Sequence, residues 1–300
     1  MTALQPDAAA PACLGPRHAV APPSFEVPPG AWDTHFHVLG PQARFPYAHD
    51  RKYTPPDALV EHYRDVQRSL GLTGGWVVHA NTHGFDNRVD LDAVDRLGRE
   101  THRAVVRVDA ALNAAQVAAW HTQGVRGVRF SFNPQHGGEL DMTVLERAVA
   151  LIRPHGWFVE LHMAPADLIA LRGWLAGLDI RLVIDHLGRI DVALGVDQPA
   201  FAALLGLVRG GNVWVKLSGV DRLTRTGPPY DDVLPYAQRL MATAPDRMLW
   251  GSDWPHTGVF DPQRMPDDGE LLNFIPAYAP TDGLRRALLV DNPLQLVEPG

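Results

Sequence analysis

A (β/α)8 barrel, a single α/β domain, is the fold class that this sequence predicts, and three observations lead to it. From Ala31 onward, short apolar runs of strand length alternate with longer segments of helical period. Eight runs can be counted, and eight parallel strands close a barrel. Polar side chains end nearly every run, where a barrel carries its chemistry. The runs are Ala31–Val38, Gly75–Asn81, Ala104–Ala110, Val125–Phe132, Trp157–Met163, Arg181–His186, Val213–Ser218 and Met248–Asp253.

The segments between the runs carry apolar stripes at helical spacing, and each stripe needs a sheet to cover it. A doubly wound open sheet is the structural alternative. The first run is not followed by a Gly-x-Gly-x-x-Gly turn, however, and the sequence has no Walker loop, which disfavours nucleotide binding. The stripes are Val60, Tyr63 and Val66; Val144, Leu145, Ala148 and Ile152; and Phe201, Leu204, Leu205 and Val208.

Two segments fall outside the strand and helix pattern. Residues 1–30 are rich in Ala and Pro and lack an amphipathic period, so we expect a loose or surface-packed arm before a barrel over residues 31–300. Residues 39–56 are too rich in proline for a helix, and we expect them to lie above the first strand as an active-site loop.

Composition excludes several classes of protein. With 46% hydrophobic and 20% charged residues, the chain has ample material for a large core. The formal net charge of -7, without a basic run, argues against nucleic acid or an anionic membrane as partner and favours a small molecule. One cysteine cannot build an internal disulfide, and no apolar stretch reaches the length of a membrane span. We therefore expect a cytoplasmic protein, either a monomer or a homo-oligomer.

The residues that end the runs are polar where apolar residues are expected, and a closed barrel would bring them to one cup. A period of two predicts that Asp33, His35 and His37 share one face, with both imidazoles pointing inward. The other strand-end residues are His79, Asn81, Arg129, Ser131, Glu160, His162, Asp185, His186, Lys216, Ser218, Asp253 and His256.

Each of these residues also has a structural interpretation. A single strand-end histidine is more often a hydrogen-bonded structural residue than a catalyst. Glu160 shares a face with His162 but lies one layer deeper, where a buried carboxylate needs a partner. Asp185 is a candidate for a strand-end hydrogen bond, and Lys216 fits either an outward side chain or the cup.

The histidines and the last carboxylate allow two kinds of chemistry. His35 and His37 on one strand face, with His162 and Asp253 from other strands, would give Zn²⁺ four protein ligands. Without a metal, the same imidazoles can polarise a carbonyl while Asp253 takes a proton from water. Residue types and spacing do not separate the two.

Two motifs resemble the amidohydrolase superfamily, in the branch called amidohydrolase 2 or TIM-barrel hydrolases. They are Asp33-Thr34-His35-Phe36-His37 and Gly251-Ser252-Asp253-Trp254-Pro255-His256, and the resemblance covers residues 31–297. Within the branch, the chain is most similar to the lactonases that include 2-pyrone-4,6-dicarboxylate lactonases and sulfomuconolactone hydrolases. Supporting segments are Gly40-Pro41, Phe45-Pro46-Tyr47, residues 51–55, 83–87, 126–130, 183–189, 221–223, 227–232 and 266–269.

The resemblance implies hydrolysis of a lactone. It places Asp253 as the group that activates water, with His35, His37 and His186 around the scissile carbonyl. The positions that match groups holding the substrate's carboxylates are Tyr53, Asn81, Arg129 and Arg222, and a guanidinium suits a carboxylate or sulfonate because it binds both oxygens at once. We add His162 and His256 to the expected substrate contacts.

The chain departs from the pyrone dicarboxylate lactonases at two positions. Those lactonases have a further arginine after the fourth strand, whereas residues 133–138 here read Asn-Pro-Gln-His-Gly-Gly. A second acidic group on the substrate is then absent or bound differently. They also have a tyrosine near the end of the fifth strand and work without metal, whereas this chain has His162, which metal-binding members use there. The sequence leaves open whether Zn²⁺ is bound.

The function that we expect is hydrolysis of a small lactone that carries a carboxylate or sulfonate, in the catabolism of aromatic or sugar-derived acids. Two alternatives stay open. Similar barrels use the same metal set for non-oxidative decarboxylation of unsaturated or aromatic acids. A non-catalytic protein that binds small acids is the other, but an inward Asp253 would repel an anionic ligand. The sequence does not identify the lactone.

Overall fold

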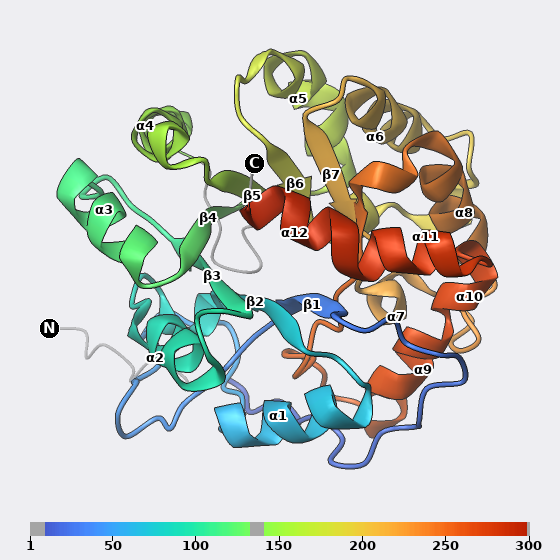
Figure 1. Cartoon of the computed structure of the whole chain (residues 1–300), viewed down its shortest axis with the longest axis horizontal. Coiled ribbons are helices and arrows are strands. Elements are labelled where there is room, and N and C mark those ends of the chain that lie inside the picture. The colour runs from blue at the N-terminus through green and yellow to red at the C-terminus, as the bar shows by residue number, and fades with distance from the viewer. Residues whose placement is uncertain (1–9, 133–140, 299–300) are drawn as a thin grey trace, which may run out of the picture.

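The structure is a computed structural model that describes residues 10–132 and 141–298. Over these residues, eight parallel strands pair in chain order from β1 to β8 and form one sheet, with helices around it (Figure 1). The predicted barrel is confirmed, and each predicted run overlaps one strand, although β2 and β3 begin one and two residues earlier than predicted. The strands are β1 (Trp32–Phe36), β2 (Gly74–Val78), β3 (His102–Arg107), β4 (Val125–Ser131), β5 (Phe158–His162), β6 (Leu182–Ile184), β7 (Val213–Lys216) and β8 (Met248–Leu249).

The helices follow the strands and cover the outer face of the sheet (Figure 1). Several begin at residues that cap the free backbone N–H groups of a first turn. The Asp141 carboxylate accepts from the backbone of Thr143 and Val144, and Asp267 does the same for Gly269 and Glu270. The helices are α1 (Val60–Ser69), α2 (Arg88–Leu97), α3 (Ala114–Thr122), α4 (Met142–Ile152), α5 (Pro165–Gly177), α6 (Pro199–Arg209), α7 (Val220–Leu223), α8 (Leu234–Thr243), α9 (Asp268–Asn273), α10 (Ile275–Tyr278), α11 (Asp282–Arg286) and α12 (Asn292–Val297).

Two apolar layers hold the barrel together. The larger lies between the strands and the helices and contains the predicted stripes of α1, α4 and α6. The smaller fills the inside of the barrel below the strand ends, and its largest members are Trp32, Trp76, Phe158 and Trp214. Leu296 and Val297 of α12 join this inner cluster and close the floor of the barrel. The chemistry is therefore confined to the other end, where the inward side chains become polar.

The barrel closes at a seam between the first and last strands, and this seam builds the site. The backbone N–H groups of Thr34 and His37 donate to Trp250 and Trp254, at 3.0 and 2.8 Å, and the N–H of Asp253 donates to His35 at 2.8 Å. Backbone hydrogen bonds thus hold residues of the first strand beside residues that follow the last strand.

Gly251 allows the two strands to approach this closely. A Cβ atom built on Gly251 would lie 2.5 Å from the Cβ of His35 and 2.7 Å from its backbone nitrogen. No side chain fits at that distance. The ladder of β8 ends at Leu249, four residues before the end of the predicted run, and the hydrogen bonds of the seam continue the pairing beyond it.

The described part of the N-terminal segment, residues 10–30, packs on the barrel. Cys13 donates its backbone N–H to Thr54 at 3.0 Å, and Ala21 donates to the Asp267 carboxylate at 2.9 Å. Residues 1–9 and the predicted departure at 133–138 lie outside the described residues. Within the described part of the chain, none of the helices combines the length and apolar character that crossing a bilayer requires.

Candidate active site

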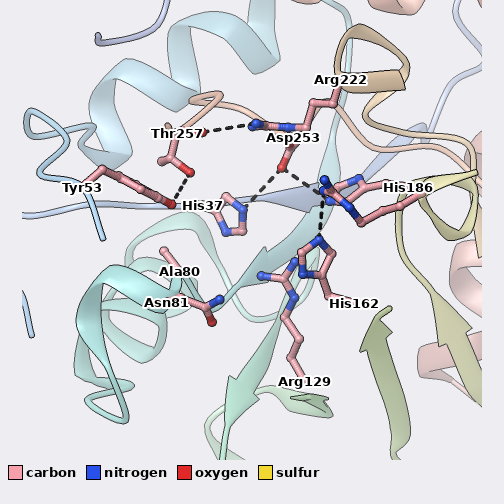
Figure 2. Close-up of a pocket in the computed structure, with 11 residues that line it drawn as sticks. His37, Tyr53, Ala80, Asn81, Arg129, His162, His186, Arg222, Asp253 and Thr257 are labelled. Atoms are coloured by element: carbon pink, nitrogen blue, oxygen red, sulfur yellow. Dashed lines mark hydrogen bonds and ion pairs between the residues drawn. The ribbon is translucent and has the colours of Figure 1, made fainter. Parts of the chain in front are cut away.

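Asp253 lies four residues after the end of β8, at the centre of a cluster of imidazoles. Its Oδ1 atom is 3.5 Å from Nε2 of His35, 3.4 Å from Nε2 of His37 and 4.0 Å from Nε2 of His186. Figure 2 shows Asp253 between His37 and His186. Asp253 has a positive φ of 65°, which is uncommon for a residue with a side chain and costs about 1 kcal/mol or more. The seam thus holds this carboxylate in a strained turn that faces the histidines.

Each imidazole is oriented by a partner on its other nitrogen. Nδ1 of His37 lies 2.7 Å from the carbonyl oxygen of Val78, which only accepts, so His37 carries a proton on Nδ1. Nδ1 of His186 lies 2.9 Å from the Ser218 hydroxyl. A Cβ atom at position 219 would lie 2.8 Å from His186 Nδ1, so the ring can occupy this place only because residue 219 is glycine. The rings are therefore positioned before any substrate arrives.

A buried charge network supports His35 from below. Nδ1 of His35 lies 2.9 Å from Nζ of Lys216 and 3.3 Å from Oδ1 of Asp185. Lys216 donates to Glu160, and Arg129 pairs with Asp185 at 2.9 Å and with Glu160 at 3.3 Å. Two cations face two carboxylates in this layer, and all four side chains are buried.

The surroundings shift the pKa values of the two carboxylates of this network in opposite directions. Burial and the neighbouring Asp185 raise the pKa of Glu160 to about 7. Burial alone would also raise the pKa of Asp185, but Lys216, His35 and Arg129 hold it well below its ordinary value. Asp185 is therefore the carboxylate that stays ionised beside His35.

Asp253 is kept ionised by an arginine from the loop after β7. Nε of Arg222 donates to Oδ2 of Asp253 at 2.6 Å, and Nη1 donates to the carbonyl oxygen of Thr257 at 3.2 Å. Burial would raise the pKa of Asp253, but the charge of Arg222 outweighs it, with help from His186 and His37, and the pKa lies well below its usual value. Arg222 occupies Oδ2, so Oδ1 is the oxygen that faces the histidines.

Three imidazoles of the site, those of His35, His162 and His186, are neutral at physiological pH. Burial lowers the pKa of His186 to about 4 and that of His35 well below its usual value, where the nearby Lys216 charge adds to the effect. Burial and the Arg129 charge likewise depress the pKa of His162. A neutral imidazole can donate one hydrogen bond or lend one lone pair, but it supplies no formal charge to a substrate.

The cluster opens into a cavity of about 460 Å³, including its mouth, which we call the central cavity. Five of the substrate contacts that we expected line it, namely Tyr53, Asn81, Arg129, His162 and Arg222. The Tyr53 hydroxyl donates to Thr257 at 2.8 Å (Figure 2). The full lining is His37, Tyr53, Ala80, Asn81, Arg129, His162, His186, Arg189, Arg222, Asp253 and Thr257.

The structure separates two of the expected substrate contacts, because His256 lies away from the central cavity and His162 lies on its wall. His256 is completely buried, its Nε2 lies 3.0 Å from Oδ1 of Asp268, and it does not belong to the lining of the central cavity. His162 does line the cavity, but its Nε2 lies 3.3 Å from Nη1 of Arg189 and its Nδ1 lies 3.2 Å from the Ser131 hydroxyl. A guanidinium nitrogen only donates, so the Nε2 lone pair of His162 is directed at Arg189.

The expectation that Asp33 shares a face with the two histidines is wrong. The pairing of β1 with β2 shifts register between Asp33 and Phe36, which breaks the period of two. Asp33 instead accepts from the Tyr63 hydroxyl at 3.2 Å and the Ser252 hydroxyl at 2.6 Å. It ties the first strand to α1 and to the seam, while His35 and His37 both face Asp253.

Two buried groups of described residues have ligand atoms close enough for a metal ion, and one of them, His35 with Glu160 and Asp185, already contacts Lys216 and Arg129. The other group faces the cavity. Nitrogen or oxygen atoms of His35, His186 and Asp253 lie within 4.8 Å of one another, and within the described chain Nε2 of His35 has no hydrogen-bond partner. His37 adds a fourth donor, because its Nδ1 proton leaves a lone pair on Nε2 that faces an Asp253 oxygen. Two lone pairs at 3.4 Å repel unless a cation or a proton lies between them. These residues fit a Zn²⁺ ion, and His186 takes the place in the set that we expected for His162.

Sequence reasoning missed Arg189 and Thr257. Arg189 is the last residue of the 3₁₀ turn His186–Arg189, in which the three residues before it also have positive φ. That turn, which strand periodicity does not describe, sends its side chain back to the cavity. Thr257 lies past the last motif and joins Tyr53 to Arg222. A search for polar residues just beyond the strand ends would have found both.

Comparison with known proteins agrees with this geometry. Residues 32–298 match the family described as Amidohydrolase. The chain is 49% identical to a 4-sulfomuconolactone hydrolase of Rhizobium radiobacter, over 95% of this chain and 96% of that protein. It is 41% identical to a 2-pyrone-4,6-dicarboxylate hydrolase of Comamonas testosteroni, over 92% and 93%. A crystal structure of an Agrobacterium tumefaciens protein without ligand superposes with a TM-score of 0.83 at 30% identity, over 93% of this chain and 99% of that one.

Proposed function

Because this chain belongs to the amidohydrolase family, we propose that it hydrolyses a small anionic lactone, with Asp253 as the general base. The observation that carries the proposal is the position of Asp253. Its Oδ1 atom faces three imidazoles, and its other oxygen is held by Arg222 at 2.6 Å. The relatives named above act on lactones that carry sulfonate or carboxylate groups, which suits a cavity lined by three arginines.

Asp253 handles the proton of the reaction. A water molecule beside Oδ1 gives a proton to the carboxylate as its oxygen forms a bond to the carbonyl carbon of the lactone. The ring C–O bond then breaks, and the proton on Asp253 passes to the ring oxygen that leaves. One water is consumed, and the product is a ring-opened hydroxy acid or its keto tautomer.

Two of the histidines, His35 and His186, can stabilise the oxygen on which charge develops, whereas Nε2 of His37 carries a lone pair and cannot donate to it. The rings of His186 and His35 are positioned by Ser218 and by the network below His35. Fixed polar groups aimed at a developing oxyanion are worth about 3–4 kcal/mol for each one removed. Because burial lowers the pKa values of His35 and His186 and keeps both rings neutral, they act through oriented dipoles and not through charge.

The anionic group of the substrate is held by the arginines at the mouth. Arg222 and Arg189 present guanidinium groups to the central cavity, and Tyr53 adds a hydroxyl. A planar guanidinium can bind both oxygens of a carboxylate or sulfonate. Asn81 and His162 complete the contacts that we propose, on the walls of the same cavity.

The same cluster would hold Zn²⁺ through His35, His37, His186 and Asp253. When bound there, the ion supplies Lewis-acid polarisation of the lactone carbonyl. The protein's contribution is the orientation of the ligands, because Val78 and Ser218 fix the rings of His37 and His186. Elemental analysis of protein purified without added metal, with His37→Gln as the comparison, tests this assignment. We expect about one Zn²⁺ per chain in the wild type and less in the variant, together with a lower Tm for wild type treated with a chelator.

The proposed reaction is tested with the wild type, Asp253→Asn, and Asp231→Asn as a control at an exposed carboxylate. Lactones with carboxylate and sulfonate groups are incubated with each protein, and ring opening and release of CO₂ are followed in parallel. We expect ring opening by the wild type and the control, and a loss of at least about a thousandfold in kcat for Asp253→Asn with an unchanged circular dichroism spectrum.

Other outcomes point elsewhere. Release of CO₂ without ring opening would identify a decarboxylase and reject the lactonase. Binding without turnover would identify a protein that only binds small acids. Ring opening that survives Asp253→Asn would leave the reaction in place but reject the assigned base.

A further inference from the structure

Residues 10–14 of the N-terminal segment lie between two loops that line the central cavity, and we call these residues the strap. On one side, the strap pairs with the loop after β1. The backbone N–H of Cys13 donates to the Thr54 carbonyl at 3.0 Å, and the N–H of Thr54 donates to the Pro11 carbonyl at 2.8 Å. The Thr54 hydroxyl donates to the Ala10 carbonyl at 2.9 Å. Thr54 is thus bonded to the strap through its N–H, its carbonyl and its side chain.

On its other side, the strap bonds to the loop after β8. The backbone N–H of Leu14 donates to the Val259 carbonyl at 2.9 Å, and the N–H of Gly258 donates to Sγ of Cys13 at 3.5 Å. Cys13 lies between the two loops and is 8% exposed. The strap therefore joins a loop that follows the first strand to a loop that follows the last strand, in addition to the seam that joins the strands themselves.

Each of these loops supplies a cavity side chain directly next to a residue that the strap binds. Tyr53 precedes Thr54, and Thr257 precedes Gly258. The Tyr53 hydroxyl donates to the Thr257 hydroxyl at 2.8 Å, and a Cβ atom on Gly258 would lie 3.5 Å from the Tyr53 ring. The two loops are in contact, and the distance between them decides whether the hydrogen bond between Tyr53 and Thr257 forms.

Thr257 connects this contact to the candidate base. Its carbonyl oxygen accepts from Nη1 of Arg222 at 3.2 Å, and Nε of the same guanidinium donates to Oδ2 of Asp253 at 2.6 Å. Figure 2 shows Thr257 between Tyr53 and Arg222. Because a guanidinium is planar and rigid, a shift of the Thr257 carbonyl changes the direction in which Nε points at Asp253. The position of the loop after β8 therefore affects the orientation of the base.

The sequence of the strap and its surroundings suits a segment that docks in one conformation. Proline fixes φ at Pro11 and at Pro16, and Pro16 also restricts Gly15 before it. A chain that is restricted in this way loses less conformational entropy when it docks. A few hydrogen bonds are then enough to hold the strap on the two loops.

We propose that the strap is a positioning element of the active site. It holds the loops after β1 and β8 at the separation at which Tyr53 bonds to Thr257, and it thereby fixes Arg222 beside Asp253. Residues 10–14 do not belong to the lining of the central cavity, so the strap acts through these side chains and not through contact with a substrate there. This inference rests on the proposed lactonase function and deepens it, because it adds residues outside the cavity to those that control turnover.

Two pairs of variants test this role, and the members of each pair differ in one hydrogen bond of the strap. Leu14→Pro removes the N–H that donates to Val259, whereas Leu14→Ala keeps it. Thr54→Val removes the hydroxyl that donates to Ala10, whereas Thr54→Ser keeps it. We expect Leu14→Pro and Thr54→Val to lower kcat/KM for a lactone by about tenfold, with KM raised through Tyr53 and kcat lowered through Arg222. Leu14→Ala and Thr54→Ser should stay within about threefold of the wild type.

Asn273→Ala is the matched control for a general loosening of the N-terminal segment. Asn273 of α9 accepts from the Ser24 N–H at 2.6 Å and donates to the Pro22 carbonyl at 2.9 Å, away from the loops that the strap joins. This variant should keep the wild-type kcat and KM. Equal losses in Asn273→Ala and Leu14→Pro would overturn the proposal. Should Leu14→Pro fail to fold, Thr54→Val and Thr54→Ser provide the comparison.

A double-mutant cycle tests the route through Tyr53. Tyr53→Phe removes the hydroxyl that bonds to Thr257, so in that background Leu14→Pro should lower kcat/KM by less than about threefold. Losses that are additive in free energy, as for independent sites, would show that the strap does not act by positioning Tyr53.

Cys13 reports directly whether the strap is docked, because it is the only cysteine in the sequence. In the wild type, the buried thiol should react slowly with Ellman's reagent. Leu14→Pro and Thr54→Val should react at least about tenfold faster, because a weakened strap is open for a larger part of the time. A faster reaction with unchanged kcat and KM would contradict the proposal, and so would a thiol that reacts as slowly in both variants as in the wild type.

The outcomes separate the strap from the reaction. A wild type that opens no lactone rejects the proposed function, and crystal structures of the wild type and Leu14→Pro then test the strap. Loss of the hydrogen bond between Tyr53 and Thr257 in the variant would support the positioning role. The same hydrogen bond in both structures would overturn it.

Discussion

Arg222 donates from Nε to the Oδ2 atom of Asp253 at 2.6 Å, so the candidate base shares an ion pair with a residue from a different loop. Asp253 follows β8, whereas Arg222 lies on α7 after β7. The two oxygens of the Asp253 carboxylate therefore have different neighbours. Oδ2 is held by the Arg222 guanidinium, and Oδ1 faces the imidazoles. The orientation of the base therefore depends on a side chain that also lines the mouth of the cavity.

Replacing Arg222 should impair catalysis more than folding. We expect Arg222→Gln to lower kcat/KM by about a hundredfold, because a charged hydrogen bond worth about 1.5–3 kcal/mol is lost from the base. Arg222→Lys should fall in between, since it keeps the charge but cannot bond Asp253 and Thr257 together. Steady-state kinetics on the best lactone measure the effect. Arg225→Gln, at an exposed arginine that pairs with Asp191, is the control, and equal losses in both variants would contradict the assigned role.

The buried network below His35 should show non-additive stability. Lys216→Met leaves Glu160 and Asp185 buried with fewer cations, which should lower the free energy of unfolding by about 3–5 kcal/mol. Adding Glu160→Gln removes the excess negative charge, so the double variant should recover much of that loss. Urea unfolding of the two single variants and the double variant measures the coupling. Strictly additive effects would show that the contact between Lys216 and Glu160 contributes little.

The seam should not tolerate a methyl group at Gly251. We expect Gly251→Ala to lower the free energy of unfolding by about 1–3 kcal/mol, because the new Cβ would lie 2.5 Å from that of His35. Activity should fall by about a hundredfold, as expected when a catalytic group moves by about 1 Å. Gly206→Ala is the matched control. No atom lies within 4 Å of its added Cβ in α6, so this change should be neutral or stabilise by up to about 1 kcal/mol.

His102 should make the fold less stable in mild acid. Burial lowers its pKa in the folded protein to about 4, whereas an unfolded chain has the ordinary value near about 6.5. The unfolded state then binds more protons between these values, so stability is complete above pH about 6.5 and falls as pH decreases towards about 4. The total loss is on the order of 3 kcal/mol.

Urea unfolding at a series of pH values should detect this loss as a flatter pH dependence in His102→Gln. The glutamine keeps a polar group next to Gln67, which lies 3.0 Å from the His102 ring in the wild type. His49→Gln, at an exposed histidine, should retain the pH dependence of the wild type. Identical curves for the wild type and His102→Gln would show that other groups control acid unfolding.

The barrel and the main members of the site could be predicted because both follow from patterns that repeat. Apolar runs that alternate with helical stripes define the strands, and closure brings His35, His37, His186 and Asp253 together whatever the loops do. The same reasoning failed for Asp33, since a single register shift in β1 turns its side chain to the other face.

The directions of side chains beyond the strand ends could not be predicted. Lys216 fitted either the cup or the outer face by period alone, and its place inside the barrel is explained by two carboxylates from β5 and the end of β6. His256 belongs to a strand-end motif, yet it turns to Asp268 because that carboxylate lies buried next to it. Partners of this kind come from distant segments, and no local pattern in the sequence records them.

The hydrogen bonds between residues 34–37 and 250–254 close the barrel, so the candidate active site is complete only when the first and last strands have met. The imidazoles come from the start of the barrel and the carboxylate from its end, so an intermediate with seven strands in place would still be inactive. Recovery of activity during refolding should therefore report the joining of the two edges, later than signals from the helices. Because Gly251 packs against the backbone of His35 where the barrel closes, the site should become active at the same step in which the barrel closes.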